Sequence, residues 1–421
     1  KIIKKIALRH QYIAVNKIIK RAREIYPQKG ENRLGVIWHT TRSGKSFTMS
    51  LVTRLLSKTK EFENPTFLVV TDRTDLDDQI TKFFRKDGFP YLKPEEAILE
   101  ADSITDLREK LKTPAGKVIF TTIQKFQVTK EERDGKVKYP KISDRRNIII
   151  IADEAHRSQY EKTAINLQTA LPHALRIGFT GTPIEIGNHS TTDTFGPILD
   201  AYKIPDAVRD KATVELTCES RPVVLHLLNK YIGEEFREIT AGLDEGTIEK
   251  ASRKWTELKI LLEDPDRIET ISKDVVHDFN AKQKVFKGKA MLAAATRLAA
   301  ARFKDTIDKI PGHPESVCIM SGAAQKFDDM TEENKTRESE IKKHYKDKNQ
   351  IKKLIEDFKD EDNPLNLLIV CDMYLTGFDA PSLTTMYVDK PLRDHNLIQA
   401  ISRVNTVWKN KPNGIIIDGV S

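Results

Sequence analysis

Short, almost entirely apolar segments recur along this chain, separated by stretches with helical periodicity. Between residues 34 and 186 these segments read GVIW, TFLVV, KVIFTT, NIIIIAD and LRIGFTGTP. A run of this length without alternating polar residues is typical of a strand buried on both faces, as in parallel sheets covered by helices. The first half of the chain is therefore predicted to form an α/β domain.

Strand-like segments of the same kind return after Lys287, with the sequences KAMLAAA, SVCIMSG, NLLIVCD, TTMYVDK and GIIIDGV. They predict a second α/β domain. We therefore expect a domain over 1–205, a connector with helical decoration over 206–285, in which VELTC and RPVVLHLL are expected strands, and a second domain over 286–421. The charged stretch 331–362 interrupts the second domain and is expected to form a solvated pair of helices.

Composition narrows the class of protein only modestly. The 421 residues carry 70 Lys and Arg against 62 Asp and Glu, which gives a net charge of +8 and a pI near 9.0. This excess favours a polyanionic partner such as nucleic acid, although intermixed charges are also typical of a solvated surface. No apolar run approaches the roughly eighteen residues of a membrane span, and the N-terminal KIIKKIALRHQY lacks a signal-peptide pattern. We expect a cytoplasmic protein without a membrane partner.

The chain contains three cysteines, Cys218, Cys318 and Cys371, which are odd in number and far apart. They form neither a CxxC pair nor a Cys/His pattern with the spacing of zinc ligands. The sequence therefore predicts neither a disulfide framework nor a zinc site, and we expect the three side chains to fill apolar cores.

The segment HTTRSGKS at 39–46 follows the predicted strand GVIW and precedes the helical pattern SFTMSLVTRLL. In such a strand–loop–helix, backbone N–H groups and the positive end of the helix face phosphate groups. Lys45 would reach the β- and γ-phosphates, and the Ser46 hydroxyl would bind magnesium. The motif GxxxxGK[ST] is incomplete, because His39 occupies its first position. The other loop residues expected to contact a nucleotide are Thr41, Ser43 and Gly44.

The segment IIIIADEAH ends a predicted buried strand with two adjacent carboxylates. The carboxyl end of such a strand lies at the crevice of an open α/β sheet, where ligands bind. Asp153 would hold magnesium, and Glu154 would orient or deprotonate the water that attacks a γ-phosphate. Adjacent acids in a solvated turn are the alternative, which the four preceding isoleucines disfavour.

Several motifs occur in an order that resembles a known family. HTTRSGKS, TDRTDLDDQ, TTIQKF, DEAH and FTGTPI follow the order of the first motor domain of superfamily two helicases, and IVCDMYLTGFDAP and HNLIQAISRVN are similar to motifs V and VI of the second. Three phrases look most like the motor subunit, R, of type I restriction enzymes: TDRTDLDDQ, LTGFDAPSLTTMYVDKP and LIQAISRVN. The resemblance covers most of the chain and implies two RecA-like parallel-sheet domains in tandem, with ATP and Mg²⁺ bound between them.

The resemblance also implies roles for individual residues of the first domain. Gln11 would read adenine, with a helix-capping residue as the alternative. Segments that follow a DNA strand or the domain cleft in related motors contain Thr71, Asp72, Arg73, Thr122 and Gln124. Residues that would couple hydrolysis to domain movement are His156, Thr180, Gly181 and Thr182. For these loops, a purely structural turn at a strand end is the alternative.

In the second domain, motif V would face both nucleotide and DNA through Asp372, Thr376, Gly377 and Asp379. Gln399 and Arg403 are four residues apart on an expected helix, so they would share one face and point at the nucleotide. An arginine at the γ-phosphate stabilises charge in the transition state, and can contribute about a thousandfold or more in rate. An exposed helix arginine is the alternative for Arg403.

Two positions depart from the family pattern. Arg42 stands where the family usually has glycine, and Thr406 stands where motif VI usually carries a second arginine. The first change puts a bulky side chain on a loop that must approach phosphate closely. The second removes a cation from the site.

The sequence therefore predicts an ATP-dependent translocase of double-stranded DNA, the motor portion of a larger R subunit that acts with modification (methyltransferase) and specificity subunits. We find no convincing set of nuclease residues in this chain. Two other functions remain open. One is a different superfamily two helicase or a remodeller-like translocase, and the other is a catalytically impaired DNA-binding scaffold, which Arg42 and Thr406 would explain.

Overall fold

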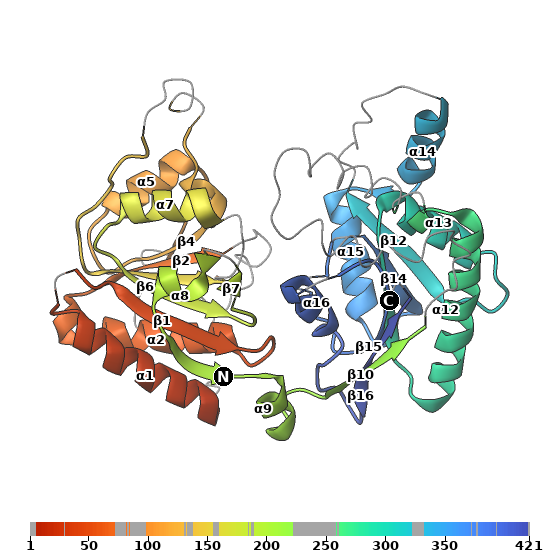
Figure 1. Ribbon diagram of the computed structural model, residues 1–421, viewed down its shortest axis with the longest axis horizontal. Helices are drawn as coiled ribbons and strands as arrows, with labels where there is room; N and C mark the ends of the chain where they lie inside the picture. The colour runs from red at the N-terminus through yellow and green to blue at the C-terminus, as the bar shows by residue number, and fades with distance from the viewer. Residues whose placement is uncertain are drawn as a thin grey trace. The chain divides into compact units, whose positions relative to one another are not determined.

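The computed structural model contains two compact units, Lys1–Ala212 and Thr213–Ser421, which are described here one at a time (Figure 1). The described residues are 6–28, 30–71, 81, 84, 98–129, 132, 138–154, 160–183, 185–186, 189–221, 258, 261–321, 332–371, 373–375, 378–392 and 394–419. Within these ranges, each helix is too short or too polar to cross a lipid bilayer.

A seven-stranded parallel sheet with the order β3-β4-β2-β5-β6-β1-β9 forms the centre of the first unit. Its strands are β1 (Arg33–His39), β2 (Thr66–Thr71), β3 (Ile98–Glu100), β4 (Val118–Thr122), β5 (Ile148–Asp153), β6 (Leu175–Thr180) and β9 (Ile198–Tyr202). All residues of β2, β4, β5 and β6 are buried, as their unbroken apolar runs predicted. The β7–β8 hairpin (Glu185–Ile186, His189–Ser190) stands apart from this sheet.

Helices cover both faces of this sheet (Figure 1). One face packs against α1 (Arg9–Ile25) and α2 (Lys45–Ser57), and the other against α5 (Ile104–Lys112) and α7 (Tyr160–Ala170). Successive strand residues alternate between the two cores: Ile149 and Ile151 of β5 face α1 and α2, whereas Ile148 and Ile150 face α5 and α7. The remaining short helices are η1 (Lys60–Phe62), η3 (Ile123–Phe126), α8 (Thr191–Phe195) and α9 (Ile204–Arg209).

The second unit repeats this plan with the parallel strand order β10-β16-β15-β11-β14-β12-β13. The strands are β10 (Glu215–Ser220), β11 (Lys289–Ala294), β12 (Glu315–Ser321), β13 (Tyr345–Lys346), β14 (Leu365–Val370), β15 (Leu383–Asp389) and β16 (Asn413–Asp418). The helices are α12 (Pro265–Val285), α13 (Arg297–Ile307), α14 (Glu332–Lys342), α15 (Lys348–Lys359) and α16 (Asp394–Ile401). One face carries α12 and α13, and the opposite face carries α15 and α16. Two parallel sheets with helices on both faces confirm the expected fold class.

The stretch 206–285, expected to form a connector, is divided between the two units. Helix α9 belongs to the first unit, whereas β10 pairs with β16 at one edge of the second sheet and α12 packs on that sheet. The reason is apolar surface: α12 buries Ile268, Ile271 and Val276 among others, which a solvated connector helix would leave exposed.

Two smaller expectations need correction. The charged stretch 331–362 does form two helices, but α15 buries Ile351, Ile355 and Phe358 in the core and is therefore not simply a solvated helix. Cys318 and Cys371 are buried as expected, whereas Cys218 is exposed. Cys218 lies on β10, an edge strand on which most residues are exposed.

A buried ion pair fixes α12 on the second sheet. Arg267 in the first turn of α12 donates from both terminal nitrogens to the carboxylate of Asp389, the last residue of β15. Each side chain is only 3% exposed. Burial raises the pKa of Asp389, and the Arg267 guanidinium opposes that rise. The carboxylate therefore depends on this arginine to remain ionised.

We expect Arg267→Met to lower the free energy of unfolding of the second unit by roughly 3–5 kcal/mol, because it leaves a buried carboxylate without its cation. Urea denaturation followed by circular dichroism measures the change. Lys273→Met on the same helix is the matched control: it removes an exposed pair with Glu269 and should cost less than about 1 kcal/mol. Equal losses in the two variants would contradict this account of Asp389.

Candidate functional site

A tight loop joins β1 to α2 in the first unit. Strand β1 ends at His39, α2 begins at Lys45, and Gly44 caps the helix with φ 81° and ψ 37°. The first N–H groups of a helix have no partner within it, so the start of α2 presents donors and the positive end of the helix dipole. The left-handed backbone of Gly44 favours glycine, and a Cβ there would also push against the end of the Gln11 side chain, at Nε2.

Helix α1 holds this loop from one side. Gln11 is buried: its Oε1 accepts from Leu8 N at 2.9 Å, and its Nε2 donates to Ser43 O at 3.1 Å. His10 Nε2 donates to the same carbonyl at 2.8 Å. Gln11 thus caps α1, the alternative considered from the sequence, and also contacts the loop. Its expected contact with adenine stays a prediction.

Arg42 retains the backbone conformation that glycine would take at this position. Its φ is 70°, in the left-handed region, where a residue with a Cβ incurs roughly 1–2 kcal/mol of strain. The substitution therefore adds a side chain and backbone strain at this position of the loop.

Lys45 and Asp153 meet at the carboxyl edge of the sheet. Strand β6 pairs with both β1 and β5, and Phe179 lies opposite Ile37 on one side and Asp153 on the other. The Lys45 ammonium donates to His39 O at 3.3 Å, and its charge acts on the Asp153 carboxyl. The predicted convergence of the phosphate-loop lysine with the acid at the end of β5 is therefore present.

The two adjacent carboxylates have different environments. Asp153 is 7% exposed, whereas Glu154 is partly exposed and has φ 50°, outside the strand. Burial raises the pKa of Asp153 to about 7, the negative charge of Glu154 adds to the rise, and the Lys45 ammonium opposes it. An ionised Asp153 is consequently short of positive charge, which a bound cation would supply.

The loop after β6 lies against the phosphate loop. Trp38 Nε1 donates to Gly181 O at 3.0 Å, and a Cβ on Gly181 would sit 3.4 Å from Thr41 Oγ1. Thr180 is fully buried and accepts from Thr182 N at 3.0 Å, which closes the turn. Three of the four expected coupling residues therefore form one rigid turn beside the loop. The fourth, His156, lies outside the described residues.

The residues expected to follow DNA come from two neighbouring strands. Thr71 ends β2 and Thr122 ends β4, and the two are directly paired in the register. Thr71 is fully buried and Thr122 is 4% exposed, whereas Gln124 in η3 is half-buried. In this conformation only Gln124 of the three offers side-chain surface. Asp72 and Arg73 lie outside the described residues.

In the second unit, Arg403 lies just beyond the helix on which it was expected. Helix α16 ends at Ile401, and Arg403 N bonds to Ala400 O, three residues back, in a tightened final turn. The side chain is 6% exposed, which excludes the exposed helix arginine. Its Nε donates to Gln399 O at 2.9 Å and its Nη1 to Phe378 O at 2.7 Å. The arginine therefore joins motif VI to the motif V loop.

The other motif V and VI residues are only partly described. Gln399 is 4% exposed and Asp379 is exposed. Thr406, the second departure from the family pattern, is half-buried and forms an isolated backbone bridge with Thr213. Asp372, Thr376 and Gly377 lie outside the described residues.

Sequence reasoning missed the residues of β9 that contact the phosphate loop. Asp200 Oδ2 accepts from His39 Nε2 at 2.8 Å, and the Tyr202 ring stacks on His10 with centroids 3.8 Å apart. Strand β9 reads ILDAY, which is short and polar compared with the other strands. His10, His39 and Asp200 are far apart in sequence, and only the fold brings them together. No local sequence pattern therefore marked them as neighbours of the phosphate loop.

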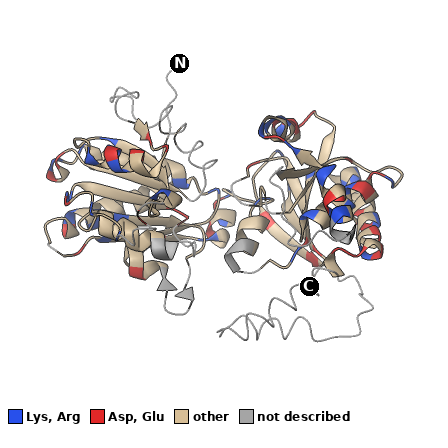
Figure 2. Cartoon of the chain, turned by 90° about the horizontal axis from the view of Figure 1, so that it is seen from above, with Lys and Arg blue, Asp and Glu red and all other residues tan. Residues whose placement is uncertain are grey.

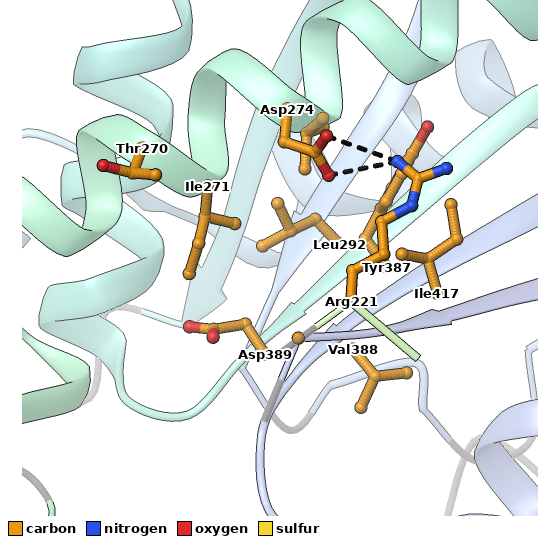
Figure 3. A pocket seen from close by; sticks show the side chains of 11 residues that line it. Arg221, Thr270, Ile271, Asp274, Leu292, Tyr387, Val388, Asp389 and Ile417 are labelled. Carbon is orange, nitrogen blue, oxygen red and sulfur yellow. Dashed lines mark hydrogen bonds and ion pairs between the residues drawn. The ribbon is translucent and has the colours of Figure 1, made fainter. Parts of the chain in front are cut away.

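The second unit also contains a cavity of about 450 Å³ between α12 and the carboxyl ends of β15 and β16 (Figure 3). Ile271, Leu292 and Tyr387 line it, and its charged groups are paired within the protein. Arg221 bonds to Asp274, and Asp389 bonds to Arg267. None of the predicted site residues lines this cavity.

Two sequence families match the chain. Residues 10–249 match the SWI2/SNF2 ATPase family, and residues 267–419 match domain 3 of the type I restriction enzyme R subunit. The type I restriction enzyme HindI endonuclease subunit of Haemophilus influenzae is 38% identical over 100% of this chain and 40% of its own length. A protein of Methanocaldococcus jannaschii is also 38% identical, over 98% of this chain and 38% of its own length. The chain spans about two fifths of the length of these relatives.

A solved structure shares the fold over nearly the whole chain. The ATP-dependent type ISP restriction-modification enzyme LlaBIII, bound to DNA, superposes with a TM-score of 0.62 over 98% of this chain and 28% of its own. Its sequence identity is 14%, so this likeness concerns the fold alone. Together with the family matches, it confirms the resemblance inferred from the motifs.

We expect Arg42→Gly to raise the free energy of unfolding by about 0.5–1 kcal/mol, because relief of the left-handed strain exceeds the entropy that glycine adds to the unfolded chain. Lys211→Gly is the matched control, because Lys211 is exposed with φ 58° and is not part of the 39–46 loop. Both variants should gain similarly in urea denaturation. A loss confined to Arg42→Gly would show that contacts of the Arg42 side chain outweigh its strain.

We expect Asp153→Asn to stabilise metal-free protein at pH 8 and to have little effect at pH 4. The folded-state pKa is raised above the unfolded value, so Asp153 destabilises the fold increasingly as pH rises from about 4 to 7. Removing the charge should restore about 4 kcal/mol at pH 8, because each of the roughly three pKa units corresponds to about 1.4 kcal/mol. Thermal unfolding in EDTA at the two pH values measures this, with exposed Asp102→Asn as the control. Equal effects of Asp153→Asn at both pH values would contradict the raised pKa.

Proposed function

Because this chain belongs to the SWI2/SNF2 ATPase family, we propose that it is the ATP-driven motor of a type I restriction enzyme R subunit, which translocates double-stranded DNA. The observation that carries this proposal is the approach of Lys45 to Asp153 at the carboxyl edge of the first sheet. A lysine from a phosphate loop beside a buried acid is the arrangement that nucleoside triphosphate hydrolysis requires. A scaffold that only binds DNA has no use for it.

The side chains at this edge fit a magnesium ion. Magnesium takes hard oxygen ligands and is usually held by one or two carboxylates together with substrate phosphates, rather than by a cage of protein groups. The described residues accordingly contain no group of three or more His, Cys, Asp or Glu arranged as a metal cage. Asp153 and Ser46 would hold the ion, which would neutralise charge on the phosphates. The raised pKa of Asp153 indicates a carboxylate that needs such a cation.

We assign the remaining roles in the first unit from this geometry. Thr41, Ser43 and Gly44 shape the backbone that faces the phosphates, and Lys45 leaves the His39 carbonyl to contact them. Ser43 Oγ is buried and has no hydrogen-bond partner among the described atoms, which suits a ligand oxygen. Glu154, more exposed than Asp153, orients the attacking water. Gln11 contacts adenine.

In the second unit, Arg403 is the residue that we assign to the charge of the transition state. Its bonds to Gln399 O and Phe378 O hold it in one position, so it needs little reorganisation to act. Gln399, Gly377 and Asp379 are the other nucleotide contacts that we propose there.

DNA would be held mainly through its phosphates. In the view of Figure 2, basic and acidic residues are interspersed along the helices. Contacts to phosphates carry no sequence information and release counterions, so binding should be sequence-independent and should weaken steeply with salt. Of the contacts that we propose, Gln124 has an accessible side chain, whereas the buried Thr71 and Thr122 would need a change of conformation to reach DNA. The other two, Arg73 and Thr376, lie outside the described residues.

The partners and the cellular location that we propose for this chain are based on its relatives. The HindI relative is named as an endonuclease subunit, so we propose that this chain works with modification and specificity subunits, and that its DNA cleavage residues lie outside the 421 residues. The relatives come from bacteria and archaea, and we propose a cytoplasmic location in such a cell.

Two other functions are distinguished by activity. A strand-separating helicase would release a labelled strand from a forked duplex, whereas a translocase would displace a triplex-forming oligonucleotide without separating the duplex. An impaired scaffold would bind DNA without hydrolysing ATP.

We expect Glu154→Gln to slow DNA-stimulated ATP hydrolysis by about 100-fold or more while ATP binding is retained, because it removes the group that orients water. Lys45→Ala should reduce both binding and hydrolysis. Phosphate release in the presence of duplex DNA measures these effects. The control is Lys58→Ala, which changes an exposed lysine at the other end of α2. Absence of DNA-stimulated hydrolysis in the unmodified chain would reject the translocase.

A further inference from the structure

A chain of polar contacts connects α1 and β9 to the phosphate loop. Lys17 Nζ donates to Asp200 Oδ1 at 2.6 Å, and Asp200 Oδ2 accepts from His39 Nε2 at 2.8 Å. His39 O in turn accepts from Lys45 Nζ at 3.3 Å. The two oxygens of Asp200 therefore link a lysine on α1 to the first residue of the loop.

The strand register brings these groups together. Strand β9 lies beside β1, with Ile37 opposite Asp200 and His39 opposite Tyr202. Side chains alternate along a strand, so Asp200 and Tyr202 share the face that also carries His39. Tyr202 O accepts from Thr40 N at 2.8 Å, and its ring stacks on His10, which donates to Ser43 O. Strand β9 thus contacts the beginning of the loop directly and reaches its middle through His10.

Burial makes Asp200 important to His39. The imidazole is fully buried, and its Nδ1 has no hydrogen-bond partner among the described atoms, so Asp200 supplies the only described hydrogen bond to the ring. Burial lowers the pKa of His39, which keeps the ring neutral. A carboxylate only accepts, so the proton of the neutral ring lies on Nε2 and the tautomer is fixed.

Lys17 keeps Asp200 ionised. Burial alone would raise the pKa of Asp200, but hydrogen bonds from His39 and Lys17 outweigh this and lower it. The Lys17 side chain is 49% exposed while that of Asp200 is 9% exposed, so the lysine brings its charge from the surface to a buried acid. A neutral Asp200 would be free to rotate and to donate, and His39 would lose its fixed partner.

We propose that Asp200 and Lys17 are positioning residues for the phosphate loop, which act through His39 to hold the loop in its phosphate-binding path before nucleotide arrives. This inference deepens the proposed function and rests on it for the identity of the ligand. The consequence for the loop backbone stands independently, because the contacts exist within the protein. Neither residue touches the reacting atoms.

The test uses the full 421-residue chain and two removals of charge. Asp200→Asn keeps the shape of the side chain and removes its charge, and Lys17→Met keeps the stem and removes the ammonium. Lys17→Arg, which retains the ion pair, is the conservative rescue. Lys110→Met is the matched control, because Lys110 forms a partly buried pair with Asp106 on α5, away from the loop.

The first readout is hydrogen–deuterium exchange of peptides covering 39–46, measured without nucleotide. Thr40 N donates to Tyr202 O on β9, and Ser43 N donates to Thr40 O, so exchange at these two amides reports the order of the loop. We expect exchange there to be about fivefold faster or more in Asp200→Asn and Lys17→Met, and to remain within about twofold of the unmodified chain in Lys17→Arg and Lys110→Met. Peptides from β4 should be unchanged in all variants.

The second readout is the affinity for the fluorescent nucleotide mant-ADP. We expect it to be about tenfold weaker in Asp200→Asn and Lys17→Met and close to the unmodified value in the other two variants. Unchanged loop exchange in both charge removals would overturn the inference, as would an equal increase in β4, which would mean general destabilisation. If the unmodified chain fails to bind mant-ADP, the proposed function fails, while loop exchange still decides whether Asp200 and Lys17 position the loop.

Discussion

The first unit depends on a conflict of charge at one edge of its sheet. A buried carboxylate, Asp153, feels the negative charge of its neighbour Glu154 and the positive charge of the Lys45 ammonium, which donates to a backbone carbonyl. Asp153 lies at the carboxyl end of the buried strand β5, the edge at which open α/β sheets bind ligands. The excess of negative charge makes the edge receptive to a cation, and the loop donors make it receptive to an anion. Magnesium bound to a triphosphate supplies both.

The loop between β1 and α2 is held by packing against α1 and carries backbone strain at one residue. Gly44 has a left-handed backbone and lies against the Gln11 side chain, which donates to Ser43 O and joins α1 to the loop. Arg42 adopts a left-handed backbone without being glycine, so the loop carries backbone strain at that position. A glycine there is favoured by energy, and a residue with a Cβ can replace it at the cost of that strain.

The sequence predicted the strands that are buried on both faces, because their apolar runs leave no other structure open to them. It placed Lys45, Asp153 and the turn at Thr180 correctly at one edge, since parallel strands end together. It was less complete where burial is partial: β9, a short edge strand, was not identified, VELTC was expected as a strand of a connector and not of the second sheet, and α16 ends two residues before Arg403. In each case the outcome depends on partners distant in sequence, such as the β16 edge that pairs with β10 and the Phe378 carbonyl that holds Arg403.

The same distinction separates the residues that sequence motifs identify from those that they miss. Lys45 and Asp153 act through their own side chains, so their types are constrained and a motif records them. Asp200 acts by accepting a hydrogen bond from His39. Another buried acceptor on a neighbouring strand would serve as well, provided that, if it is an acid, it is kept ionised as Asp200 is. Groups of this second kind are recognised only when the fold shows which side chain faces which. For this reason the control of a phosphate loop is best sought on the strand beside it rather than within the motif itself.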